Sequence, residues 1–461
     1  MLKNILRVLS ANGVVAIIGF LSSLFLPKVL PIEEYAIYQS FVLYLSYISV
    51  LHLGFPSGMN IKYAGVKLDD IDKKQYKAEM WILFLVLMLF SVNFFSLSVI
   101  LNSEMMGYIS LMIFPYCFLS SFSVLLQAWE KFQEYAILHT IVSAGPLALP
   151  MIVYICTGQA SGRINIYLYI LVYVITTIIC LVYHARIVKG IESNRLVSKE
   201  NWETEKIGFC FLLGNYISLL IHSVDKQFAN WFCTAAGFSY YSFALTMQNV
   251  MTIFITAISQ PLFPHMAAGR MDRKAYVKAE RVLLLLGSFS GIAYFLCDLV
   301  VKLWIPNYIE SLSVIRVYFA VFPAMSIVNS LYLNMYKARR LVKRYILDLI
   351  LVLAFAVMAN IVAVKTGYGY IGIAIVTVIL YYVWLIYGTC IFEEMRMGKE
   401  EVLFVISFFV IYTIIPNMLG GFSGIIAYLV LDIVVFSACF PNEIKDVIRI
   451  SKSLMNKGRK M

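Results

Sequence analysis

Apolar segments long enough to cross a bilayer follow one another along most of this chain. A transmembrane helix needs about 20 mainly apolar residues, and by that measure the sequence predicts fourteen spans. They are 5–26, 35–55, 79–101, 106–128, 136–157, 164–188, 207–231, 238–263, 280–304, 311–336, 341–364, 369–391, 401–416 and 421–440. The last two are short. The pattern predicts an all-α, polytopic membrane protein.

Two of these segments, 207–231 and 238–263, carry polar residues at helical spacing. Such residues lie on one face of a helix. Hydrocarbon penalises polar faces, so we expect these two to line a water-filled cavity or to contact neighbouring helices, an arrangement typical of a transporter. The residues are Asn215, Ser218, His222 and Asp225 with the adjacent Lys226, and then Ser242, Thr246, Asn249, Thr256 and Gln260.

Composition and charge agree with this interpretation. The chain has 461 residues, of which 61% are hydrophobic and 14% charged, and its net charge is +11. With fourteen spans, 31 Lys and Arg residues fall on one side of the membrane and only Lys28, Arg163 and Lys365 lie in the opposite loops. The positive-inside rule therefore predicts that both termini are cytoplasmic. The positive charge is explained by topology, and we expect no nucleic-acid partner.

Three short patterns resemble a known family. Asp225-Lys226, the aromatic turn Gly237–Tyr241 and Pro261-Leu-Phe-Pro264 before a basic loop are similar to the polysaccharide transporter branch of the multidrug/oligosaccharidyl-lipid/polysaccharide exporter superfamily. The resemblance implies two six-helix bundles around a central cavity and an additional helix pair. It also implies a flippase for an undecaprenyl-pyrophosphate-linked glycan in the bacterial inner membrane, acting beside membrane lipid, a polysaccharide polymerase and chain-length machinery. O-antigen, lipopolysaccharide, capsule or exopolysaccharide assembly would be its pathway.

A weak internal repeat supports two bundles. Tyr35–Gln39 parallels Phe238–Ser242 at an offset of 203. Six spans per repeat would place both halves in one orientation, related by an axis along the membrane normal. We expect one bundle in 1–200, a second in 201–395, a helix pair in 396–441 and a basic cytoplasmic tail in 442–461.

Cationic residues near the ends of spans are the candidate substrate-binding groups. Lys226 and Arg316 would offer positive charge to an anionic head group, and Arg grips phosphate in a bidentate manner. A mutual salt bridge among Asp225, Lys226 and Arg316, or snorkelling of these side chains to the membrane interface, explains them equally well. Lys62 and Arg270 would receive the same head group at the cytoplasmic side. His222 is either a proton carrier or an ordinary hydrogen-bonded residue.

Other ionisable residues within spans have simpler interpretations. Asp298 and Lys302 are four residues apart and can form an ion pair, and Asp348 lies next to a basic loop. Asp432 has no partner that the sequence identifies. Prolines inside or at the ends of spans predict bent helices at positions 56, 115, 146, 150, 261, 264 and 323. The G-x-x-x-G pairs Gly54/Gly58, Gly287/Gly291 and Gly420/Gly424 predict close helix packing.

The sequence contains no motif for metal or cofactor chemistry. A G-x-G-x-x-G match at 367–372 lies in a predicted outer turn without a preceding strand, so it does not indicate dinucleotide binding. We expect no cofactor, no metal and no catalytic residue, and the eight cysteines are expected to be buried thiols. A cation-coupled multidrug exporter of the same superfamily is the main alternative. A membrane-embedded glycosyl-transferring enzyme is another, but its chemistry would need a larger outer loop.

Overall fold

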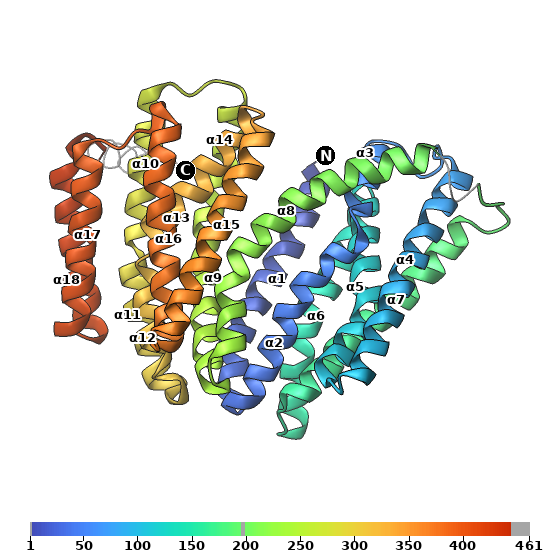
Figure 1. Ribbon diagram of the computed structural model, residues 1–461, viewed down its shortest axis with the longest axis horizontal. Coiled ribbons are helices and arrows are strands. Elements are labelled where there is room, and N and C mark those ends of the chain that lie inside the picture. Colours follow the sequence, from blue (N-terminus) through green and yellow to red (C-terminus); the bar gives the residue numbers. More distant parts are fainter. Residues whose placement is uncertain (1, 195–198, 444–461) are drawn as a thin grey trace, which may run out of the picture. The chain divides into compact units, whose positions relative to one another are not determined.

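The computed structural model describes residues 2–194 and 199–443. Within those ranges the regular elements are all helices (Figure 1). The predicted all-α, polytopic fold is therefore confirmed.

The chain divides into two compact units, residues 1–223 and 224–461. The division falls inside α8 (Lys199–Phe232). The first unit contains α1 (Leu2–Val29), α2 (Ile32–Ile48), η1 (Ser49–His52), α3 (Phe55–Tyr63), α4 (Lys73–Ile100), α5 (Glu104–Ala128), α6 (Phe132–Thr157) and α7 (Gly162–Ile187). The second contains α9 (Ala235–Ala267), α10 (Arg273–Ser288), α11 (Ser290–Trp304), η2 (Pro306–Tyr308), α12 (Ser311–Phe319), α13 (Phe322–Ile327), η3 (Val328–Tyr332), α14 (Leu333–Ala338), α15 (Val342–Lys365), α16 (Gly369–Ile391), η4 (Glu393–Met395), α17 (Lys399–Met418) and α18 (Gly421–Cys439).

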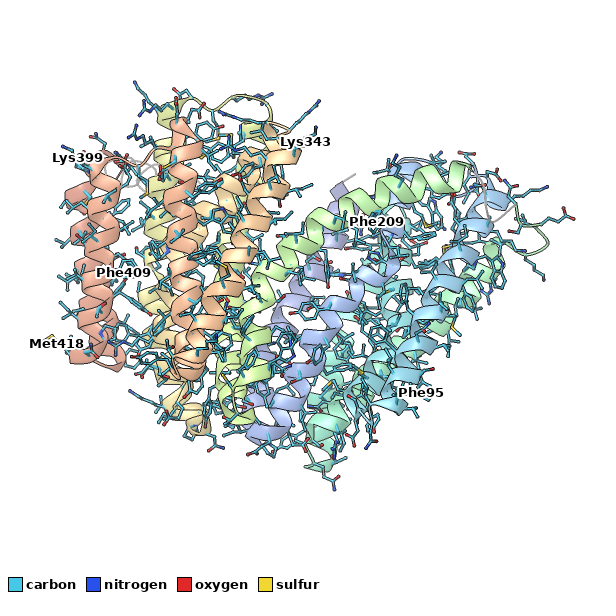
Figure 2. The ribbon with its side chains drawn as sticks, in the orientation of Figure 1. Phe95, Phe209, Lys343, Lys399, Phe409 and Met418 are labelled. Atoms are coloured by element: carbon cyan, nitrogen blue, oxygen red, sulfur yellow. The ribbon has the colours of Figure 1, made fainter. Side chains whose placement is uncertain are left out.

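The helices coincide with the predicted spans. Ten are long and apolar enough to cross a membrane, and two bent helix pairs raise the number to 12 among the described residues. The helices α8 and α9, of 34 and 33 residues, lie at the two other predicted segments and include side chains outside the described set. Apolar side chains cover the helix surfaces (Figure 2), as at Phe95 on α4 and at Val402 and Ile406 on α17.

Two spans are bent where the sequence contains Gly and Pro. The helices on either side of Leu53–Gly54 differ in direction by 55°, and those on either side of Ala320–Val321 by 51°. Pro56 and Pro323 each stand in the first turn of the helix that follows the bend, where a missing N–H has no cost. Gly54 has a φ of 90°, and its backbone packs directly against Gly208 of α8. The predicted bends at these two prolines are confirmed, whereas Pro115, Pro146 and Pro150 lie inside α5 and α6, each of which is one continuous helix.

Polar caps fix where several helices begin. Asp72 accepts hydrogen bonds from the backbone N–H groups of Lys74 and Gln75 at the start of α4. Ser103, Thr234 and Asp272 do the same for α5, α9 and α10. Such caps satisfy donors that have no partner within the helix.

The last helix pair is attached to the second unit through α18, which packs on α11. The ring of Tyr428 lies against Gly291, where a larger residue would not fit. Its hydroxyl donates to the carbonyl of Ser288 (2.8 Å), and the Ser288 hydroxyl donates to Asp432 (2.8 Å). Ser288 is the last residue of α10, so Asp432 stabilises the junction between α10 and α11. This contact supplies the partner for Asp432 that the sequence did not identify, and the predicted close packing at Gly291 is confirmed.

Arg281 links α10 to the same region. Its guanidinium forms ion pairs of 2.7 Å with Glu400, Glu401 and Glu443 and lies 4.8 Å from the ring centroid of Phe440. A planar group with several donors suits such multiple pairing.

The described cysteines form no disulfide. Five are buried or partly buried, but Cys156 and Cys390 are exposed, so the prediction of burial is wrong for these two. Both lie on apolar helices, whose outer faces are exposed. Among the described residues, no group of three His, Cys, Asp or Glu side chains could hold a metal ion.

Candidate functional site

Asp225 lies at the centre of a hydroxyl-lined site in the second unit. Its side chain is buried, and one carboxylate oxygen accepts hydrogen bonds from three hydroxyl groups. The donors are Tyr241 of α9 (2.8 Å), Tyr318 of α12 (2.9 Å) and Thr377 of α16 (3.1 Å). Four helices therefore meet at one carboxylate.

Lys226 is the cation adjacent to Asp225. Its backbone N–H donates to the Asp225 carboxylate (2.7 Å), and its ammonium interacts electrostatically with the same group. Hydroxyl groups can donate, and they also carry lone pairs. The site has the chemistry to hold a small monovalent cation, with Tyr and Thr oxygens turning from donors to ligands.

The first unit has a related position without the acid. At the offset of 203, Asp225 corresponds to Ser22 and Tyr241 to Tyr38. Ser22 and Tyr38 are both buried, and the Tyr38 hydroxyl has no hydrogen-bond partner. The phenol is thus present at both positions, but the carboxylate is present only in the second unit.

Lys226 and Arg316, the two predicted cations, lie in different surroundings. The ammonium of Lys226 is 6.0 Å from the ring centroid of Phe238. The guanidinium of Arg316 donates to the carbonyl of Thr413 on α17 (3.2 Å). Arg316 and Tyr318 are two residues apart on α12, so Tyr318 faces Asp225 while Arg316 faces α17. The structure does not join Arg316 and Asp225 in a salt bridge.

The polar face of α9 changes along its length. Ser242 is fully buried, Thr246 is partly buried, and Asn249 and Thr256 are exposed. The side chain of Gln260 lies outside the described set. Exposed polar groups within a long apolar helix are expected where that face of the helix is in contact with water.

The predicted polar residues of α8 show a comparable pattern. Asn215 and His222 are exposed, Ser218 is partly buried, and Asp225 is buried. The helical spacing therefore identified a polar stripe, but only Asp225 belongs to a closed hydrogen-bonded cluster. The role of the others remains a prediction.

Lys62 and Arg270 occupy helix ends. Lys62 forms an ion pair of 2.6 Å with Glu79, which also accepts a hydrogen bond from Tyr63 (2.7 Å). Lys62 is thus engaged within the first unit. Arg270 follows α9 and is exposed.

The remaining acidic residues have local partners. Asp298 and Lys302 form the predicted pair at 2.7 Å. Asp348 accepts from the hydroxyls of Tyr336 (2.6 Å) and Tyr387 (2.8 Å) and lies 3.7 Å from Arg344. The predicted ion pair of Asp298 is confirmed, and these contacts are structural.

The first unit contains two cavities that the sequence did not indicate. One, of about 450 Å³, lies between α1 and α6; the other, of about 170 Å³, lies among α5, α6 and α7. The first is lined by Arg7, Ser10, Ala11, Val14, Gln133, Ala136, Ile137, Thr140 and Ile141, and the second by Tyr116, Leu119, Ser120, Ser123, Leu138, His139, Val142 and Tyr173. Arg7 is one of the 31 Lys and Arg residues that the sequence places on the cytoplasmic side.

Comparison of whole structures identifies the class of fold. A structure of the lipid II flippase MurJ, in an inward closed conformation, aligns with a TM-score of 0.67 and 14% identity over 96% of this chain and 100% of that one. An inward-facing multidrug resistance MATE transporter aligns with a TM-score of 0.58 and 14% identity over 84% of this chain and 96% of that one. A MOP superfamily transporter from Pyrococcus furiosus aligns with a TM-score of 0.52 and 14% identity over 86% of this chain and 97% of that one. No family model and no curated protein sequence matches the chain.

This is therefore a multi-pass membrane protein with a transporter fold. More specifically, its fold is similar to the folds of these lipid flippase and multidrug transporter structures, and the fold that the sequence resemblance implies is confirmed.

Proposed function

We propose that this protein is a flippase that moves a polyprenyl-pyrophosphate-linked oligosaccharide across the bacterial inner membrane for O-antigen, capsule or exopolysaccharide biosynthesis. The observation that carries the proposal is the shared fold with a lipid II flippase over 96% of this chain and the full length of the other. The resemblance of the Asp225-Lys226 region to polysaccharide transporters supports the choice of substrate. The basic loops support cytoplasmic termini.

The proposed mechanism follows from the chemistry of such a substrate. Its pyrophosphate and sugars require a hydrated path, whereas its polyprenyl chain is soluble in lipid. Exposed polar residues on α8 and α9, such as Asn215 and Asn249, would contact the glycan. Lys226 and Arg316 would bind the pyrophosphate, since Arg has five N–H donors and, among the described residues, the hydrogen bond from Arg316 to the carbonyl of Thr413 uses one of them. Alternating access would move the head group from one leaflet to the other.

Entry and release would use residues at helix ends. Lys62 would exchange its contact with Glu79 for the incoming pyrophosphate, and Arg270, which is exposed, would contact it as well. A polysaccharide polymerase and chain-length machinery would act on the product after translocation.

Charge reversal tests the proposed cationic residues. Lys226→Glu and Arg316→Glu would each be expressed in a strain that depends on this protein for surface polysaccharide, and polymer would be measured at equal protein abundance. Arg163→Glu is the control, because Arg163 pairs with Glu104 where both side chains are more than half exposed. We expect loss of polymer for the first two variants and normal polymer for the control. Normal polymer in all three would exclude Lys226 and Arg316 from substrate binding.

A second candidate function is cation-coupled export of a drug by the same fold. The buried Asp225 with its three hydroxyl donors favours it, as do the alignments with MATE transporters. Drug susceptibility of an expressing strain separates the two functions. Resistance that disappears in Asp225→Asn, with unchanged surface polysaccharide, would favour the exporter.

A further inference from the structure

Glu280 differs from every other buried carboxylate in the described chain. Six of the seven accept hydrogen bonds or pair with a cation. These six are Glu79, Asp225, Asp298, Asp348, Glu401 and Asp432. Glu280 is 1% exposed, yet neither of its oxygens has a partner. An unpaired ionised carboxylate in such a position costs several kcal/mol.

The position of Glu280 on α10 explains its isolation. The buried residues of this helix, including Tyr276, Leu283, Leu284 and Gly287, follow at helical spacing, and Glu280 is among them. Its carboxyl group therefore projects from the face that packs on α13, while Arg281 projects toward α17. The arrangement places one acid in the contact between α10 and α13, where the buried Ser326 hydroxyl donates to the carbonyl of Leu283 (2.9 Å) and not to Glu280.

The charged and titratable groups around Glu280 do not neutralise a negative charge. Arg281, the adjacent cation on its own helix, attracts a charged Glu280, but its donors are engaged by Glu400, Glu401 and Glu443. Glu401 of α17 repels a charged Glu280. From η3, the hydroxyl of Tyr332 lies within electrostatic reach and has no hydrogen-bond partner.

On η4, which also packs on α10, Glu394 is already paired with Arg339. Metal ions take several oxygen ligands. Among the described residues, no group of three His, Cys, Asp or Glu side chains could hold a metal ion, whereas one carboxyl group is sufficient for a proton.

We propose that Glu280 is a proton-binding site, separate from the site at Asp225. A bound proton makes the carboxyl group neutral, so that no charge is buried. The protonated oxygen is also a hydrogen-bond donor, at a position where no described residue donates to the carboxylate. The hydroxyl of Tyr332, which is also unpaired, is the position to which that donor can turn. The chain would thus contain a second titratable position at which proton uptake can be linked to a change of conformation.

Infrared spectroscopy of the purified full-length protein tests the proposal directly. At neutral pH, we expect a C=O stretch of a protonated carboxyl group that shifts when isotope-labelled glutamate is incorporated. The band should be lost in Glu280→Gln and kept in Glu400→Gln, because Glu400 is 59% exposed and pairs with Arg281. Absence of a glutamate-dependent band from the wild-type protein would overturn the proposal, and this arm needs no variant to fold.

Thermal unfolding supplies an independent readout. A proton held by Glu280 in the folded state but not in the unfolded state makes the wild type less stable as pH rises above the ordinary range of glutamate. The unfolding equilibrium constant of the wild type, relative to Glu280→Gln, should then rise by up to about tenfold per pH unit. The unfolding equilibrium constant of the wild type relative to Glu400→Gln should show no such rise with pH. If the ratio of the unfolding equilibrium constants of the wild type and Glu280→Gln did not change with pH, proton binding at Glu280 would be contradicted.

Discussion

The hydroxyl of Tyr241 donates a 2.8 Å hydrogen bond to the buried carboxylate of Asp225. Tyr38, which follows the same sequence pattern in the first unit, is equally buried, but its hydroxyl has no partner. The two phenols therefore form a matched pair, one bonded to an acid and one not.

Removing each hydroxyl should have different effects on stability. Tyr241→Phe leaves Asp225 with one donor fewer and should cost about 1–3 kcal/mol. Tyr38→Phe removes a hydroxyl that makes no hydrogen bond, so it should leave stability unchanged or raise it. Thermal unfolding of the two purified variants measures the difference. Equal losses of Tm in the two variants would contradict a stabilising hydrogen bond from Tyr241 to Asp225 that Tyr38 lacks.

Neutralising Asp225 should impair transport without unfolding the protein. Asp225→Asn keeps the shape of the side chain and removes a buried charge, so we expect normal abundance and loss of translocation activity. Asp432→Asn is the matched control, because that carboxylate bonds to Ser288 at a helix junction. We expect it to retain activity. Activity in Asp225→Asn equal to that of the wild type would remove Asp225 from the transport cycle.

Breaking the Arg281 cluster should destabilise the contact between α10 and α17. Arg281→Gln leaves the nearly buried Glu401 without its ion pair, and loss of one partner from a buried pair costs about 3–5 kcal/mol. Arg339→Gln removes the more exposed pair with Glu394 and should cost less than about 1 kcal/mol. Denaturant or thermal unfolding in detergent compares them. Similar losses in both variants would argue against a structural role for the cluster.

The pair of Arg339 and Glu394 should also depend on pH. The hydrogen bond from Arg339 lowers the pKa of Glu394. A lowered pKa stabilises the folded state above the ordinary pKa of glutamate, and that stabilisation is lost as pH falls through the folded-state value. The Tm difference between wild type and Arg339→Gln should therefore narrow at acidic pH. A difference that widens on acidification would be inconsistent with this pair.

The bend at Gly54 should tolerate no side chain. Gly54 and Gly65 both have positive φ, 90° and 78°, but only Gly54 lies against another backbone, that of Gly208. Gly65→Ala should cost only the local strain of about 1–3 kcal/mol. Gly54→Ala should cost clearly more, because α8 must also move. Protein yield and Tm of both variants test this, and equal values would show that the contact with Gly208 does not matter.

Much of the fold could be predicted from the sequence because hydrophobic length and helical spacing are local properties. The fourteen predicted segments all coincide with helices, and the prolines and glycines located two bends. The site could be predicted only in part. Asp225 stood out as an ionisable residue in an apolar segment, but its donors Tyr318 and Thr377 are 93 and 152 residues away. Nothing in a single sequence brings such residues together.

The same reason explains the residues that were missed. Glu280 is the first residue of the predicted span 280–304. The sequence does not show that its carboxylate lacks a partner, because this depends on which residues pack against α10. Arg316 was grouped with Lys226 by position along the chain, whereas its contact with Thr413 depends on how α17 is placed.

The most direct test of the account is a translocation assay with the purified protein. Liposomes would contain an undecaprenyl-pyrophosphate-linked oligosaccharide, and a glycan-modifying enzyme added outside would report how much substrate reaches the outer leaflet. We predict that the protein makes nearly all of the substrate accessible and that the Asp225→Asn variant does not. If wild-type protein leaves the inner-leaflet substrate protected, as in protein-free liposomes, the flippase proposal is wrong.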